Sequence, residues 1–242
     1  MKVFIVFAHP EPQSLNGSLL KVAVEELESQ GHEVKVSDLY AMKWKSQVDR
    51  EDFPQHPADE RLRVTKASAV ATYSGTLTDD VRQEQEKLKW ADFVIFQFPL
   101  WCTARRTGVI DMEKEFCLEK RAMVVVTLGG WKEHYSARGI GGPLEDLLFP
   151  VTHGTFYYTG MEVLPSFAMY RTDRATDEQF KEAADELRQR MKTLFTAKPI
   201  AFRRQNGGDY EIPALTLKRG LEGPNASGFS LHSRNVEDAT ES

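Results

Sequence analysis

Residues 2–8 read Lys-Val-Phe-Ile-Val-Phe-Ala, a short and almost wholly apolar run rich in β-branched and aromatic side chains. A run of this kind without polar alternation predicts a strand buried on both faces, as in a parallel sheet. Ser14 is a suitable N-cap for a helix whose apolar stripe recurs every four residues. The stripe consists of Leu15, Leu19, Ala23 and Leu27. Residues 33–39 alternate in polarity, so the chain opens as strand, helix, strand.

Three further strands are predicted downstream. Residues 92–98 and 122–127 are apolar runs of the same buried type, and residues 161–167 form a fifth strand. Pro165 lies inside this last run, and a proline cannot donate to a sheet ladder, so we expect an edge strand there. Strands that alternate with helices predict an α/β fold, in which helices cover both faces of a parallel sheet.

Two helices have clear boundaries in the remaining sequence. Residues 79–90 predict a polar helix, and residues 177–195 predict a longer one that begins with a capping box formed by Thr176 and Gln179. Residues 41–75 show no clean period and contain prolines and many charges, so we expect a long surface excursion there.

The composition is that of an ordinary globular chain. The 242 residues are 41% hydrophobic and 28% charged, and the formal net charge of −5 argues against a nucleic-acid partner. Cys102 and Cys117 have no zinc-ligand spacing, and the first apolar run is too short for a membrane span or signal peptide. We therefore expect a cytoplasmic protein without a metal. Its predicted parts are a domain at 1–200 and a polar, partly disordered C-terminal extension at 201–242.

Ligands of parallel α/β sheets bind at the carboxyl ends of the strands. Here those ends are followed by the loops 9–16, 99–103 and 127–135. The first loop enters a helix N-terminus, which is an anion site, although it lacks the GxGxxG and P-loop patterns. A phosphate there would be held by His9, Ser14, Asn16 and backbone amides. The alternative is an ordinary capped turn.

The other two loops carry an aromatic residue and a glycine pair. A flat cofactor could lie along the backbone that leads to Trp101, unless this side chain belongs to the core. Gly129 and Gly130 permit close approach of the backbone to a ligand. Tyr135 could donate a hydrogen bond to a carbonyl or enolate oxygen, or it could be a plain surface tyrosine.

Several stretches together resemble the NAD(P)H:quinone oxidoreductase family. They are Phe4–Glu11, Ser14–Asn16, Ser37–Met42, Ala91–Trp101, Lys120–Ala122, Thr127–Gly130, Tyr135–Ser136 with Gly139, and Pro150–Leu164. The match covers most of residues 1–200. It implies a flavodoxin-like fold, whose five-stranded parallel sheet has the order 2-1-3-4-5 with helices on both faces.

The resemblance also implies a chemistry. Such proteins bind FAD, or FMN in smaller relatives, and are typically homodimers. NAD(P)H gives a hydride to the flavin and leaves, and a quinone or similar acceptor then takes two electrons in a ping-pong reaction. The cofactor performs the hydride chemistry, while the protein orients it and stabilises charge.

The resemblance assigns roles to individual positions. It implies Tyr135 as the catalytic residue, because its hydroxyl would donate toward the flavin where the reduced ring gathers negative charge. The implied cofactor-binding residues are His9, Ser14, Leu15, Asn16, Pro99, Leu100, Trp101, Cys102, Thr103, Thr127, Leu128, Gly129, Gly130 and Tyr135.

The sequence departs from the family pattern in two places. Segment 102–119 lacks the usual aromatic-glycine turn and following helix, and the connection between Trp101 and Arg121 is shorter than in the family. Gly141 stands where a histidine often partners the tyrosine. An alternative interpretation is therefore a catalytically impaired, flavodoxin-like binding or regulatory protein.

Overall fold

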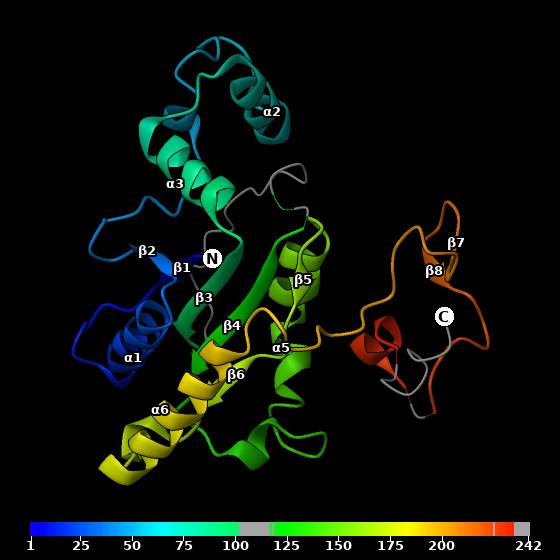
Figure 1. Cartoon of the computed structure of the whole chain (residues 1–242). Helices are drawn as coiled ribbons and strands as arrows, with labels where there is room; N and C mark the ends of the chain where they lie inside the picture. Colours follow the sequence, from blue (N-terminus) through cyan, green and yellow to red (C-terminus); the bar gives the residue numbers. More distant parts are fainter. Residues whose placement is uncertain (102–116, 118, 225, 235–242) are drawn as a thin grey trace.

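The central sheet consists of parallel strands. The computed structural model describes residues 1–101, 117, 119–224 and 226–234 (Figure 1). The strands are β1 (Lys2–Phe7), β2 (Glu33–Asp38), β3 (Phe93–Pro99), β4 (Arg121–Thr127), β5 (Glu162–Val163) and β6 (Phe167–Met169). Their order is β2-β1-β3-β4-β5, and β6 also pairs with β4. The predicted flavodoxin-like fold and strand order are thereby confirmed.

Helices cover both faces of this sheet, as Figure 1 shows. They are α1 (Leu15–Ser29) and α6 (Asp177–Lys192) on one face, and α3 (Asp79–Trp90) and α5 (Leu144–Val151) on the other. Because side chains alternate along a strand, Ile5 packs in the first layer and Phe4 in the second. Both are buried, which explains why the opening strand is apolar on both faces.

The prediction of one continuous fifth strand at residues 161–167 is wrong. The strand is split into β5 and β6, which both pair with β4 at the edge of the sheet. Pro165 lies between them and has no N–H to donate. The last backbone donor before the break is Leu164, whose N–H donates to Ala122 O at 2.8 Å.

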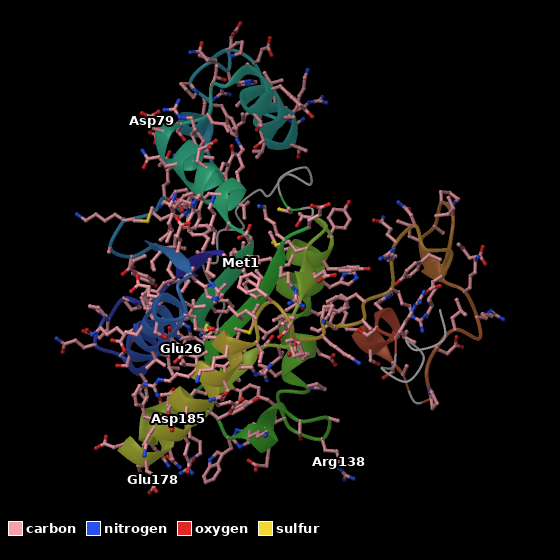
Figure 2. The ribbon with its side chains drawn as sticks, in the orientation of Figure 1. Met1, Glu26, Asp79, Arg138, Glu178 and Asp185 are labelled. Carbon is pink, nitrogen blue, oxygen red and sulfur yellow. The ribbon has the colours of Figure 1, made fainter. Side chains whose placement is uncertain are left out.

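Two helices were not predicted. The expected surface excursion at 41–75 contains α2 (Val64–Ser74), which buries only Ala67 and Ala71 beside Phe53 and so has a weak apolar signal. Helix α5 is short, ends near Pro150, and continues into a π-helical turn at Thr152–Tyr157. None of the described helices has a segment long and apolar enough to cross a bilayer. Figure 2 shows the charged side chains of Asp79, Arg138 and Glu178 on the outside of the ribbon.

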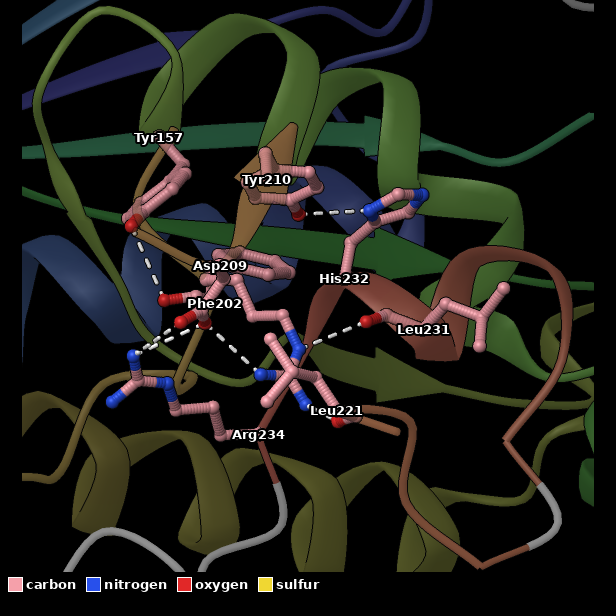
Figure 3. A network of polar contacts seen from close by, with 9 residues as sticks. Tyr157, Phe202, Asp209, Tyr210, Leu221, Leu231, His232 and Arg234 are labelled. Atoms are coloured by element: carbon pink, nitrogen blue, oxygen red, sulfur yellow. Dashed lines mark hydrogen bonds and ion pairs between the residues drawn. The ribbon is translucent and has the colours of Figure 1, made fainter. Parts of the chain in front are cut away.

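The chain after α6 folds around a buried arginine. Arg203 is only 6% exposed, and its guanidinium donates to Leu231 O, to Leu221 O and to the Asp209 carboxylate. Arg234 also pairs with Asp209, and Figure 3 shows this network. The extension contains a short hairpin of β7 (Tyr210–Glu211) and β8 (Thr216–Leu217).

Aromatic stacking attaches this extension to the sheet domain. The ring of Phe149 lies between those of His153 and Phe229, at centroid distances of 4.5 Å and 4.4 Å. The phenol of Tyr157 donates to Phe202 O. The described part of the extension, which ends at residue 234, is therefore packed against α5 and the π-helical turn.

Candidate functional site

A cavity of about 480 Å³ opens at the carboxyl ends of β1, β3 and β4. It is formed by the three loops that were predicted from the sequence, joined by the loop that follows β6. The lining residues are His9, Ser14, Leu15, Asn16, Pro99, Leu100, Trp101, Thr127, Gly129, Gly130, Tyr135, Thr172 and Asp173. The parallel register of the strands brings these loops to one edge of the sheet.

Two buried polar side chains, Asn16 and Thr127, form the floor of the cavity, and the buried Gln97, which does not line it, supports Asn16. Asn16 Nδ2 donates to Thr127 Oγ1 at 2.9 Å, and Gln97 Nε2 donates to Asn16 O and Oδ1 at 2.7 and 3.1 Å. These bonds fix both ends of the Asn16 amide. Gln97 Oε1 is buried without a hydrogen-bond partner among the described residues. The cavity surface at Asn16 and Thr127 is therefore polar and preorganised before any ligand binds.

The N-terminus of α1 forms one wall. Ser14 Oγ accepts the Gly17 N–H at 3.1 Å, while the amides of Leu15 and Asn16 have no acceptor among the described contacts. A Cβ on Gly17 would lie 2.2 Å from Pro12 O, so only glycine lets the preceding loop fold over this turn. The arrangement leaves two amides at the positive end of the helix dipole to bind an anion.

Glycines make room for Tyr135 at the opposite wall. A Cβ on Gly130 would lie 3.0 Å from a ring carbon of Tyr135, and one on Gly141 would lie 3.2 Å from another. The ring of Tyr170 is 5.9 Å away between centroids. Burial raises the pKa of Tyr170, and the Glu145 carboxylate raises it further, so this second phenol stays neutral. Gly141 thus lies directly against the tyrosine ring.

Trp101 lies at the rim. Its side chain is 52% exposed, so the alternative that it belongs to the core is wrong. Its ring is 5.8 Å from that of His9 in an edge-to-face arrangement. His9 Nδ1 accepts the Glu11 N–H at 2.9 Å, which fixes the ring. The backbone of β3 continues to the rim through Leu100, whose N–H donates to Thr127 O.

The predicted site residues mostly converge, with three exceptions. The side chain of Leu128 is buried in the core under α5, so it does not line the cavity. Cys102 and Thr103, and with them most of segment 102–119, lie outside the described residues. Sequence reasoning missed Thr172 and Asp173, although they follow the last strand at the same edge. The split of that strand hid the signal.

Metal binding has no support in the part of the chain that the structure describes. It contains no group of three or more His, Cys, Asp or Glu side chains that could hold a metal ion. Cys117 is buried, and burial raises the pKa of its thiol, which is typical of an unreactive cysteine.

Comparison with known proteins identifies the family. The model of a family with a flavodoxin-like fold matches residues 1–191. A ribosyldihydronicotinamide dehydrogenase-like protein of Penicillium crustosum is 52% identical, and the alignment covers 100% of this chain and 98% of that protein. The ribosyldihydronicotinamide dehydrogenase [quinone] of Mus musculus is 36% identical over 82% of this chain and 94% of its own length.

A solved structure agrees with these relatives. A protein of Klebsiella pneumoniae, provisionally named a quinone reductase, superposes with a TM-score of 0.88. It is 45% identical, and the match covers 97% of this chain and 100% of that one.

From the sheet order, the cavity and these matches together, the chain belongs to the NAD(P)H:quinone oxidoreductase family of flavodoxin-like oxidoreductases.

Proposed function

We propose that this protein is a flavin-dependent oxidoreductase that transfers electrons from NAD(P)H to a quinone or to a related acceptor. The observation that carries the proposal is the cavity at the strand ends, where a helix N-terminus, a polar floor and a glycine pair meet. Its volume of about 480 Å³ falls within the range of roughly 300–1,000 Å³ that is usual for small-molecule sites. The cofactor we propose is FAD, with FMN as the alternative.

The donors and surfaces of the cavity fit a flavin. The amides of Leu15 and Asn16, with Ser14, suit a phosphate, because they combine free N–H groups with a helix dipole. The backbone of Pro99–Trp101 and the glycine pair Gly129–Gly130, which both line the cavity, offer two backbone strips for a flat ring. The side chains of Asn16 and Thr127, which line the cavity and are bonded to each other, give it a polar floor.

A bound flavin supplies a ring that takes a hydride from NAD(P)H and passes two electrons to the quinone in a second, ping-pong half-reaction. The role of Tyr135 is to hold a proton on its phenol oxygen and to donate a hydrogen bond where negative charge gathers. The side chains of Trp101 and Tyr135, which both line the cavity, would contact a bound substrate.

We propose residues 1–200 as the flavin-binding domain and residues 201–242 as a polar C-terminal extension, whose described part packs against that domain. We also propose a homodimer, as the family resemblance implies, and a cytoplasmic location. Light scattering on the eluting protein measures the dimer. A mass near twice 27.5 kDa is the expected result, and a mass near 27.5 kDa contradicts it.

Steady-state oxidation of NADH and NADPH with a panel of quinones and dyes tests the activity. The protein is first reconstituted with FAD or FMN. We expect quinone-dependent oxidation of the nicotinamide. Double-reciprocal plots at several quinone concentrations should give parallel lines, as a ping-pong reaction does, and not the intersecting lines of a ternary complex. Flavin binding without turnover on any acceptor would favour the alternative, an impaired binding protein, over the enzyme.

A further inference from the structure

A positively charged side chain, that of Arg171, belongs to the loop that follows β6, beside the cavity. Arg171 N donates to Gly130 O, and Thr172 N donates to Leu128 O, each at 3.0 Å. Gly130 and Thr172 both line the cavity. Arg171 is therefore attached through its backbone to one lining residue and is next in sequence to another.

The side chain of Arg171 is held against an aromatic ring. Its Cζ lies 3.9 Å from the centroid of the Trp131 ring. Trp131 directly follows Gly130 and is 48% exposed, so the stacked pair belongs to the rim and not to the core. A guanidinium stacked on an indole keeps its edge free to donate hydrogen bonds.

The charge of Arg171 is not neutralised by the described part of the chain. No ion pair there joins it to a carboxylate, in contrast to Arg121, which pairs with Glu162, and to Arg203, which pairs with Asp209. Its backbone also adopts φ +57°, a left-handed conformation that is strained for a residue with a side chain. Strain of this kind clusters at binding sites, where the surrounding structure maintains it.

We infer that Arg171, held in place by Trp131, determines substrate specificity by binding anionic oxygens of a molecule that enters the cavity. The inference rests on the proposed function. The shared chemistry is a phosphate or carboxylate oxygen that accepts two N–H groups of the guanidinium. It comes either from the pyridine nucleotide or from an acidic substituent on the acceptor.

Substrate pairs that differ in charge separate these sources. The electron donors are dihydronicotinamide riboside, which has no phosphate, NADH and NADPH. The acceptors are a neutral naphthoquinone and its carboxylated analogue. The variants are Arg171→Ala and Arg171→Lys, with Arg174→Ala as the matched control, because Arg174 is an exposed cation of the same loop.

We expect Arg171→Ala to raise the KM of the anionic partner by roughly tenfold or more, with kcat and the KM of its neutral counterpart unchanged. Arg171→Lys retains part of the effect, because it keeps the charge but loses the planar fork. The difference shrinks at high salt. Arg174→Ala behaves like the parent protein. If Arg171→Ala changes the KM of charged and neutral substrates equally, or changes neither, the inference is overturned. The stack of Arg171 on Trp131 then has a structural role only.

Binding without turnover keeps this test independent of the enzyme activity. Calorimetry compares 1-naphthoate with the neutral 1-naphthamide on the purified protein. Preferential binding of naphthoate that disappears in Arg171→Ala supports the inference even where the parent protein oxidises no nicotinamide, in which case the proposed function alone fails. Trp131→Phe retains the preference and Trp131→Ala weakens it. Equal binding of the two compounds by the parent protein contradicts the inference.

Discussion

Replacement of Asn16 by alanine measures how far the floor of the cavity is preorganised before any ligand binds. Asn16 is 1% exposed, and its side chain takes part in two hydrogen bonds, one to Thr127 Oγ1 and one from Gln97 Nε2. Each buried bond contributes about 1 kcal/mol, so the free energy of unfolding should fall by about 2 kcal/mol. Gln97 Nε2 keeps its bond to the Asn16 carbonyl, which limits the loss.

Urea denaturation and thermal unfolding of the protein without cofactor provide the assay. A loss of about 2 kcal/mol corresponds to a fall in Tm of about 4–8 °C for a chain of this length. Thr127→Val completes a double-mutant cycle, in which Asn16→Ala should cost less because one partner is already gone. The same cost in both backgrounds, or an unchanged stability, would refute the network. Flavin affinity should fall together with stability, because the amide that lines the cavity is lost.

Three further predictions concern other parts of the site and its surroundings. Tyr135→Phe should slow the reductive half-reaction in rapid mixing by at least about tenfold while the flavin Kd changes little, and an unchanged rate contradicts the role of its hydroxyl. Gly17→Ala should destabilise the protein by about 1–3 kcal/mol in urea, because its Cβ would lie 2.2 Å from Pro12 O. Gly154→Ala is the control, since a Cβ there meets nothing within 4 Å. Burial, and secondly the charge of His232, lower the pKa of His153. The free energy of unfolding should therefore be unaffected by this group above about pH 6.5 and should decrease as the pH falls below that value. His153→Gln should flatten that part of the profile of stability against pH, and an unaltered slope speaks against it.

The parallel sheet was predictable because its strands β1, β3 and β4 are buried along most of their length. In β4, for example, Ala122 to Val126 are fully buried. Such a strand has a continuous apolar run, which is not expected of an element on the surface. The ends of such strands also locate the cavity, since the topology brings them to one edge. His9, Asn16, Trp101 and Tyr135 were therefore found as neighbours although they are far apart in the sequence.

The parts that were missed lack a strong local pattern. Helix α2 buries two alanines and leaves Tyr73 83% exposed, so its apolar stripe is too thin to stand out. The break at Pro165 turned one predicted strand into two and concealed the loop that carries Arg171 and Asp173. Gln97 lies inside the predicted strand 92–98, where nothing in the sequence distinguishes it. Its role under the cavity depends on a contact with Asn16, 81 residues away in sequence, which no local pattern encodes.

The absorbance spectrum of the purified protein tests the flavin site most directly. It is recorded as isolated and again after incubation with FAD or FMN and removal of the excess. We predict the two visible bands of an oxidised flavin, at close to one equivalent per chain, and release of FAD on denaturation. A protein that stays colourless after both incubations would contradict the proposed site.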